Sequence, residues 1–197
     1  MVTTNYSNLL EVKDNYLDDK DFKGVTDIIM DSPDFLWVYS PYVAYPEGVS
    51  YSEEKEAVVW GNAPTTELGQ IYYYHNIGGT DEPAYNFMLP IYKKLGIGQN
   101  THDYVRTRAI HYPRTERIIK HPLHFDDNKY CKTLLLYLNT CNGYTYHKPA
   151  DQKIYNVANR ALIFDASELH HSTTTTNADR RVILQINIGT GPGALYS

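Results

Sequence analysis

The side chains best suited to metal chemistry lie in two separate segments of the sequence. The first contains His124 and Asp126, two positions apart, and on a β-strand this spacing directs both side chains to one face. The second contains the adjacent residues His170 and His171, so a further imidazole comes from a distant part of the chain. Two imidazoles and one carboxylate form the facial triad that binds non-haem Fe(II) and leaves coordination positions open for oxygen chemistry.

A strand-like segment near the end of the sequence offers a second kind of site residue. It begins with Arg180 and Arg181, and either arginine could bind the carboxylate of a chelating co-substrate through paired, charge-assisted hydrogen bonds. If Arg181 faces inward, the alternate residues form an aliphatic outer face that helices can cover. The outer set is Val182, Leu184, Ile186 and Ile188, and the inner set is Arg181, Ile183, Gln185 and Asn187. Placing Arg180 inward would put the aliphatic set in a wet cavity, so we predict that Arg181 faces the site.

A mainly β core must position these side chains. From residue 103 onward, segments rich in β-branched and aromatic residues are bounded by Asn, Gly, Asp or Pro. The predicted strands are Tyr104–Tyr112, Pro122–Asp126, Lys132–Asn139, Tyr144–His147, Gln152–Val157, Ala161–Asp165, His170–Thr174 and Arg180–Gly189. Short strands at such close intervals predict a small barrel or two-sheet roll rather than a parallel α/β sheet.

The first half of the chain has mixed patterns. Residues 1–18 are polar without a clear period, so we expect a loosely attached terminus. Apolar residues at helical spacing predict helices over 19–30 and 81–96, the second of which Pro90 must kink or restart. Segments 35–45, 56–60 and 68–76 are predicted to be strands.

Composition restricts the class of protein. The chain has 197 residues, is 42% hydrophobic and 21% charged, and carries a formal net charge of −5. These values fit a single folded domain and exclude global disorder. The acidic balance argues against non-specific nucleic-acid binding. We find no apolar stretch of membrane-spanning length and no secretory signal pattern, so we expect a cytoplasmic protein without a membrane partner.

The core resembles that of the 2-oxoglutarate and Fe(II)-dependent dioxygenases, from about residue 104 to 188. The motifs that carry the resemblance are His-x-Asp at 124–126, Tyr-Leu-Asn at 137–139, Asn-Gly-Tyr-Thr at 142–145, Asn-Arg-Ala-Leu-Ile-Phe-Asp at 159–165 and His-x-Ser at 170–172. The spacing of 11 between His170 and Arg181 is similar to that of the phytanoyl-CoA hydroxylase branch, and Tyr-Leu-Asn is similar to the prolyl hydroxylases. As a whole, the chain resembles small hydroxylase-like proteins encoded by marine bacteriophages.

This resemblance implies a fold and a set of roles. It implies one domain over residues 1–197, mainly β with flanking helices, with a double-stranded β-helix (jelly-roll, cupin-like) core over about 104–189 and helical and strand support over 19–103. His124, Asp126 and His170 would bind Fe(II). Arg181 would anchor the co-substrate 2-oxoglutarate, and Tyr137 would add a phenolic hydrogen bond. With O₂, such a site would convert 2-oxoglutarate to succinate and CO₂ and hydroxylate a substrate.

Some assignments stay open on sequence. His171 could replace His170 as a ligand, and Asp127 is expected to lie in a turn or to support the site from outside. The remaining histidines are expected on the surface or hydrogen-bonded in the core, with His111 and His121 able to line the mouth of the cleft. These residues are His75, His102, His111, His121 and His147.

Cys131 and Cys141 flank the predicted strand 132–139. Ten residues at about 3.3 Å each would hold their Cα atoms roughly 30 Å apart, which is too far for a disulfide. We therefore predict two free thiols.

Three functions remain on sequence grounds. The leading one is a hydroxylase of a protein side chain, with prolyl hydroxylation favoured by resemblance. The second is a nucleic-acid base oxygenase or demethylase, since the segment 106–121 holds five Lys or Arg and one Glu. The third is a non-catalytic barrel that binds a metal or ligand without turnover.

Overall fold

The structure is a computed structural model that describes residues 10–40, 49–52, 57–60, 72–77, 83–97, 104–126 and 132–189. Its largest element is a seven-stranded sheet in which neighbouring strands pair antiparallel. In spatial order the strands are β1 (Glu11–Lys13), β10 (Arg160–Asp165), β7 (Lys132–Tyr137), β12 (Arg180–Gly189), β6 (Tyr104–Pro113), β5 (Tyr72–Ile77) and β2 (Val38–Ser40). β12 lies at the centre, so both of its edges are paired.

A smaller sheet faces the large one. It has the order β11 (His170–His171), β8 (Tyr144–His147) and β9 (Gln152–Tyr155). An apolar cluster lies between them; it includes Leu135, Tyr137, Leu162, Phe164 and Ile183 of the large sheet and Ile154 of the small one. This arrangement is the predicted mainly β jelly-roll core with flanking helices. A separate pair, β3 (Val49–Ser52) with β4 (Ala57–Trp60), forms a third sheet.

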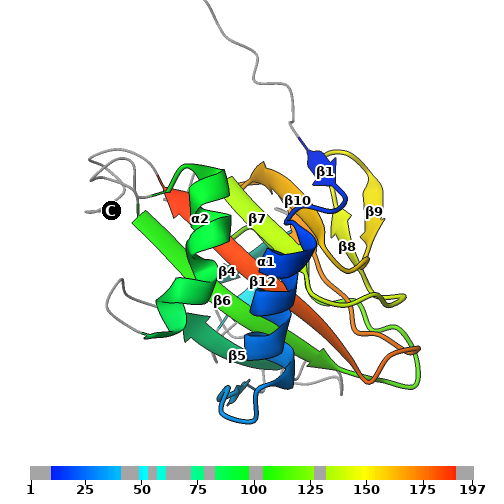
Figure 1. Ribbon diagram of the computed structural model, residues 1–197. Coiled ribbons are helices and arrows are strands. Elements are labelled where there is room, and N and C mark those ends of the chain that lie inside the picture. Colours follow the sequence, from blue (N-terminus) through cyan, green and yellow to red (C-terminus); the bar gives the residue numbers. More distant parts are fainter. Residues whose placement is uncertain are drawn as a thin grey trace, which may run out of the picture.

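Two helices cover the opposite face of the large sheet (Figure 1). α1 (Asp19–Thr26) begins where the Asp18 carboxylate accepts a hydrogen bond from the Asp21 amide at 2.8 Å, and it continues into the π-helix η1 (Asp27–Asp31). α2 (Leu89–Leu95) follows the 3₁₀ helix η2 (Pro83–Met88), so Pro90 stands at a helix start, as one of the two predicted outcomes required. It ends at Gly96, whose φ of +71° suits a residue without a Cβ.

The alternation predicted for β12 is confirmed. Val182, Leu184 and Ile186 are fully buried in the core beneath the helices, and Ile188 packs against it. Ile183 belongs instead to the core between the two sheets. The remaining inner residues of β12 are polar and face the same inter-sheet space.

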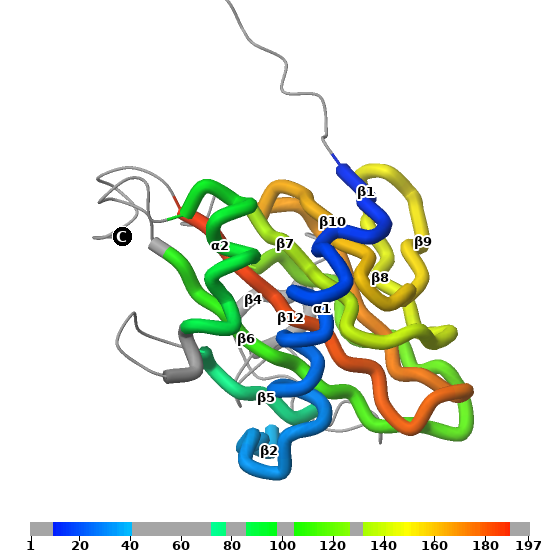
Figure 2. The backbone as a smooth tube through the Cα atoms, viewed as in Figure 1, coloured from blue at the N-terminus to red at the C-terminus, as the bar shows by residue number. Residues whose placement is uncertain are grey.

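The prediction of a loose terminus was wrong for residues 10–18. β1 pairs with β10, and Tyr16 and Leu17 are buried. Asn159 fixes this segment, because its side chain accepts from the Leu17 amide at 2.9 Å and donates to the Leu17 carbonyl at 2.8 Å. Figure 2 shows the chain running from this edge strand directly into α1. Local periodicity misses such an element because its partners lie far along the chain.

The predicted strand at 122–126 was also wrong, since this segment pairs only through isolated bridges. Lys120 bridges to Thr173 and His124 bridges to His170, so the segment runs antiparallel beside β11. Pro122 has no amide N–H and therefore interrupts a regular ladder. The strand expected over 170–174 is likewise shorter and covers only His170–His171.

The remaining expectations differ mainly at the ends of elements. The strands expected over 35–45 and 68–76 correspond to β2 and β5, with residues 41–45 and 68–71 outside the described residues, and β3 was not predicted. Cys141 is buried and free, as expected, whereas Cys131 lies outside the described residues.

Candidate active site

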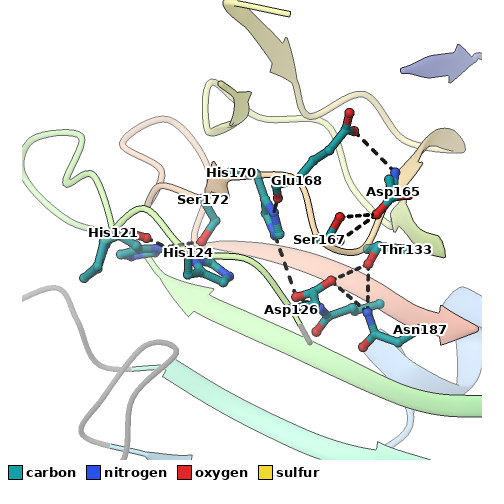
Figure 3. Close-up of polar contacts among 12 residues, drawn as sticks. His121, His124, Asp126, Thr133, Asp165, Ser167, Glu168, His170, Ser172 and Asn187 are labelled. Atoms are coloured by element: carbon teal, nitrogen blue, oxygen red, sulfur yellow. Dashed lines mark hydrogen bonds and ion pairs between the residues drawn. The ribbon is translucent and has the colours of Figure 1, made fainter. Parts of the chain in front are cut away.

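Three side chains from the two predicted segments converge at one end of the inter-sheet space. Candidate ligand atoms of His124, Asp126 and His170 all lie within 4.8 Å of one another. Figure 3 shows these side chains pointing toward one another, with Asp126 beneath the two imidazoles. The backbones of His124 and His170 exchange two hydrogen bonds, at 2.9 and 2.8 Å, and these hold the two residues side by side. Regular strand structure at 122–126 is therefore not needed to bring the pair to one place.

Both imidazoles are held in the tautomer that metal binding needs. Nδ1 of His124 lies 3.0 Å from the Pro122 carbonyl, and Nδ1 of His170 lies 2.9 Å from the Glu168 carbonyl. A carbonyl only accepts, so Nδ1 is the donor in each ring and the lone pair of the neutral ring is on Nε2. Nε2 of His170 is 3.7 Å from Oδ1 of Asp126.

Burial keeps the two rings neutral. It lowers the pKa of His124 to about 4, with the charge of a protonated His170 acting in the same direction. Burial also lowers the pKa of His170, although the nearby Asp126 carboxylate opposes that shift. Neutral imidazoles are the form that binds a cation.

Asp126 is surrounded by hydrogen-bond donors. Oδ1 accepts from Nε2 of Gln185 at 2.7 Å, and Oδ2 accepts from Nδ2 of Asn187 at 2.7 Å and from the Thr133 hydroxyl. Burial alone would raise the pKa of Asp126, but His170, His124 and the Thr133 hydroxyl hold it below its ordinary value. The carboxyl is therefore ionised although its side chain is only 3% exposed.

The amide of Asn187 is itself oriented from behind. Nε and Nη2 of Arg106 donate to Oδ1 of Asn187 at 3.1 and 2.9 Å. Because the oxygen of the amide is occupied by these donors, its nitrogen must point at Asp126 and Thr133. Their parity with Arg181 on β12 predicted that Gln185 and Asn187 face inward, but it did not indicate that they donate to Asp126.

Arg181 lies on the same face of β12 and is completely buried. Its guanidinium donates to three neutral acceptors, namely Oδ1 of Asn156 at 2.7 Å, the Thr173 carbonyl at 2.8 Å and Oγ1 of Thr145 at 3.0 Å. No acidic side chain among the described residues pairs with it. A buried arginine of this kind lacks a counter-ion, and a carboxylate ligand would supply one.

Tyr137 and Gly143 complete the surroundings of Arg181. The guanidinium carbon lies 5.6 Å from the centre of the Tyr137 ring, and burial raises the pKa of Tyr137, so its hydroxyl stays protonated. Gly143 leaves the space for the arginine stem, because a Cβ there would lie 2.6 Å from Cδ of Arg181.

The open alternatives are separated by geometry. His171 does not join the three converging groups, and its Nδ1 lies 3.0 Å from the Ser172 carbonyl. Arg180 points to the helix side, where Nη2 donates to the Met30 carbonyl at 2.7 Å. Asp127 and His102 lie outside the described residues.

The other described histidines have structural partners. His147 is buried against Glu168 with Nε2 2.8 Å from Oε2, and His121 is buried with Nδ1 2.6 Å from the Ser172 hydroxyl. Nδ1 of His75 lies 2.8 Å from the Leu36 carbonyl, and the His111 ring packs on Trp37.

In the described part of the chain, no helix is both long and apolar enough to cross a bilayer.

The donor set itself indicates the kind of ion it would hold. Two neutral nitrogen ligands and one carboxylate suit a divalent transition metal, and this combination is the facial set used for non-haem Fe(II). The backbone carbonyls behind each imidazole are the outer contacts expected of metal-binding histidines. His124, Asp126 and His170 therefore fit Fe(II).

Comparison with known proteins supports the fold. No protein-family model and no curated protein matches the sequence. Among solved structures, the chain is similar to a prolyl hydroxylase from Trichoplax adhaerens in complex with a peptide of the hypoxia-inducible-factor oxygen degradation domain, with a TM-score of 0.63, 15% identity and coverage of 95% of this chain and 87% of that one.

Two further structures have the same core. The non-heme alpha-ketoglutarate-dependent epimerase SnoN of nogalamycin biosynthesis gives a TM-score of 0.58 at 9% identity, covering 93% of this chain and 79% of that one. The viral collagen prolyl hydroxylase of Paramecium Bursaria Chlorella virus-1, in complex with 2-oxoglutarate, gives 0.53 at 11% identity, covering 92% and 96%. The chain therefore has the double-stranded β-helix fold of the 2-oxoglutarate and Fe(II)-dependent oxygenases.

Proposed function

We propose that this protein is a 2-oxoglutarate-dependent Fe(II) oxygenase that hydroxylates a side chain of a protein or peptide, with proline the favoured target. The observation that carries the proposal is the presence of two features in the space between the two sheets. One is the convergence of His124, Asp126 and His170, and the other is the buried Arg181, which has no acidic partner in the described chain.

The chain's own residues have separable tasks in this proposal. Nε2 of His124, Nε2 of His170 and one oxygen of Asp126 would hold Fe(II). When bound, Fe(II) would supply the redox-active Lewis acid at which 2-oxoglutarate and O₂ give succinate and CO₂, with one oxygen atom inserted into a substrate C–H bond.

Arg181 and Tyr137 would bind the carboxylate of 2-oxoglutarate that lies far from the metal. Arg181 shares the inner face of β12 with Gln185, and Gln185 donates to Asp126, so one strand carries both the anchor and a contact to a candidate metal ligand. Burial excludes water from the guanidinium and strengthens its attraction for an anion. The protonated hydroxyl of Tyr137 would donate a further hydrogen bond.

The choice of a peptide substrate rests on the similar structures. The Trichoplax adhaerens enzyme is a prolyl hydroxylase solved with a peptide. The epimerase with the same fold indicates that the fold by itself does not fix the substrate.

Anaerobic reconstitution with Fe(II) and 2-oxoglutarate tests the proposal. We expect a weak visible charge-transfer band of the chelate, and succinate release when O₂ is admitted. The matched pair His170→Ala and His171→Ala separates ligand from neighbour, because only the first should abolish the band. Arg181→Met and Arg180→Met form a second pair, in which only the first should weaken 2-oxoglutarate binding.

A wild-type protein that binds neither Fe(II) nor 2-oxoglutarate would overturn the proposal. Binding without succinate release, in the presence or absence of peptides, would instead indicate the non-catalytic barrel.

A further inference from the structure

A second arginine lies on the metal-facing side of the large sheet, one strand away from the site. Gln185 of β12 is the cross-strand partner of Arg108 of β6, and Arg108 is the partner of Asn76 of β5. Gln185 donates to Asp126, so this row of three residues starts next to a candidate metal ligand. Cross-strand partners lie about 5 Å apart, which places the backbone of Arg108 close to the reacting centre.

The side chain of Arg108 is held in one orientation. Its Nε donates to Oδ1 of Asn76 at 3.0 Å, and its guanidinium carbon lies 4.9 Å from the centre of the Tyr74 ring. Tyr74 itself packs against the core between the sheets. Stacking on an aromatic ring and a fixed Nε reduce the rotamer freedom that an arginine loses on binding a ligand.

The two Nη groups of the Arg108 guanidinium are not used in the hydrogen bond to Asn76. Among the residues that the structure describes, neither Nη nitrogen has a hydrogen-bond acceptor and no acidic side chain pairs with Arg108. The side chain is part-buried rather than free in solvent. A planar pair of donors, pre-oriented and without a counter-ion, matches a carboxylate.

Arg108 is separate from the proposed co-substrate anchor. Arg181 is paired with Tyr112 on β6, four residues along the strand from Arg108. The metal-facing surface also carries Arg106, which is bound to Asn187. Arg181 and Arg108 differ from it, because neither donates to a residue that contacts Asp126, and in the described chain neither has an acidic partner. A site that takes one anionic co-substrate needs only one of them, so the other is left for a second ligand.

We propose that Arg108 binds a carboxylate of the primary substrate and so selects substrates with an acidic group close to the C–H bond that is hydroxylated. This inference rests on the proposed oxygenase function and names its substrate class. We favour an acidic side chain of a peptide over a nucleic-acid backbone, because one pre-oriented fork suits a single anion and the net charge of −5 repels a polyanion.

The first experiment selects binders from a randomised peptide library with a fixed central proline, using protein loaded with Fe(II) and 2-oxoglutarate without O₂. We expect wild type to enrich Asp or Glu at a fixed distance from the proline. Arg108→Gln should lose this preference and Arg108→Glu should replace it with Lys or Arg. Arg117→Gln is the matched control, since Arg117 is an exposed arginine of the same basic segment and should keep the wild-type preference.

The second experiment measures the contact itself. Replacing the acidic residue of a selected peptide by its amide should weaken binding to wild type about 10-fold or more, as loss of a charge-assisted hydrogen bond predicts. The same replacement should change binding to Arg108→Gln by less than about 2-fold, because the partner is already absent. A panel of small carboxylic acids, scored by stimulated succinate release, identifies a free acid as the source of the carboxylate.

The outcomes separate the two proposals. The charge-transfer band should be the same in wild type and Arg108→Gln, and a wild type without the band would remove the proposed function itself. A normal band combined with no acidic preference, in the peptide library or among the small carboxylic acids, would overturn only the role of Arg108. An acidic preference that survives Arg108→Gln, or selection of single-stranded DNA over every carboxylate, would do the same.

Discussion

The two faces of β12 use the same strand for different purposes. On the helix side, Val182, Leu184 and Ile186 are buried among apolar neighbours and need only fill space. On the inner side, Arg181, Gln185 and Asn187 are each fixed by hydrogen bonds to named partners. Successive residues therefore alternate between stability and chemistry. The fold can keep a polar site beside its centre because the opposite face of the same strand supplies apolar burial.

The energetics of the two faces differ in kind. Burial of an aliphatic side chain contributes about 1.5–3 kcal/mol and tolerates substitutes of similar volume. A buried polar group destabilises the fold unless it is hydrogen-bonded. Among the described residues, every buried side-chain nitrogen or oxygen has a partner. The inner face therefore depends on specific partners, whereas the outer face depends on volume.

The largest effect on this comparison is expected at the outer face. Leu184→Ala removes a fully buried side chain and should lower the free energy of unfolding by about 2–5 kcal/mol in urea denaturation. The folded fraction should bind Fe(II) with wild-type affinity, because Leu184 points away from the three ligands. Loss of metal affinity at unchanged stability would show that the two faces are not separable.

At the inner face, a single added methyl group should disturb the anchor. A Cβ at Gly143 would lie 2.6 Å from Cδ of Arg181 and 2.8 Å from the Thr174 carbonyl, and the backbone oxygen has little freedom to move. Gly143→Ala should therefore cost about 1–3 kcal/mol and weaken 2-oxoglutarate binding, measured by calorimetry. Gly24→Ala is the control, since nothing lies within 4 Å there and helical alanine should stabilise α1. Equal effects of the two changes would refute this account.

The polar contacts behind Asp126 should affect the metal more than the fold. Asn187→Ala removes one donor to Asp126 and the acceptor of Arg106, and should weaken Fe(II) binding about 10–100-fold in anaerobic titration. Asn139→Ala provides a comparison, because Asn139 bonds the backbone of β12 on either side of Arg181 without touching the triad. Its metal affinity per folded molecule should stay at the wild-type value.

The smallest expected effect is the pH response of the outer face. Burial, helped by the charge of Arg180, lowers the pKa of His111 from 6.5 to about 4. Between these values the unfolded chain binds more protons than the folded one, so the free energy of unfolding falls as pH drops from 6.5 toward 4. His111→Phe keeps contact with Trp37 and should lose less stability over this window, as denaturation at several pH values would test. Parallel curves for the two proteins would assign the loss to other groups.

Alternation made much of the site predictable. The alternating aliphatic residues of β12 predicted that Arg181 faces inward, and His124, Asp126 and His170 do converge. The strand predicted to carry His124 and Asp126 is absent, and an isolated bridge to His170 positions His124 instead. The spacing of two positions still brings both side chains to the site.

Other parts depended on contacts that no local pattern records. Thr145, Asn156 and Thr173 reach Arg181 from the small sheet or the segments next to it, and only pairing between sheets reveals them as its partners. The donors to Asp126 are Thr133 of β7, 7 positions away, and Gln185 and Asn187 of β12, 59 and 61 positions away along the chain. Residues 10–18 were misjudged for the same reason.

The two hydrogen bonds between Leu17 and Asn159 also determine when the segment around Leu17 can take its folded position during synthesis. They join positions 142 residues apart, so a nascent chain that has just exposed Leu17 must wait for its partner. At a synthesis rate of about 5–20 residues per second the delay is roughly 7–30 s. During this interval Tyr16 and Leu17 lack the partners that bury them in the folded protein, which makes this segment a natural target for chaperones.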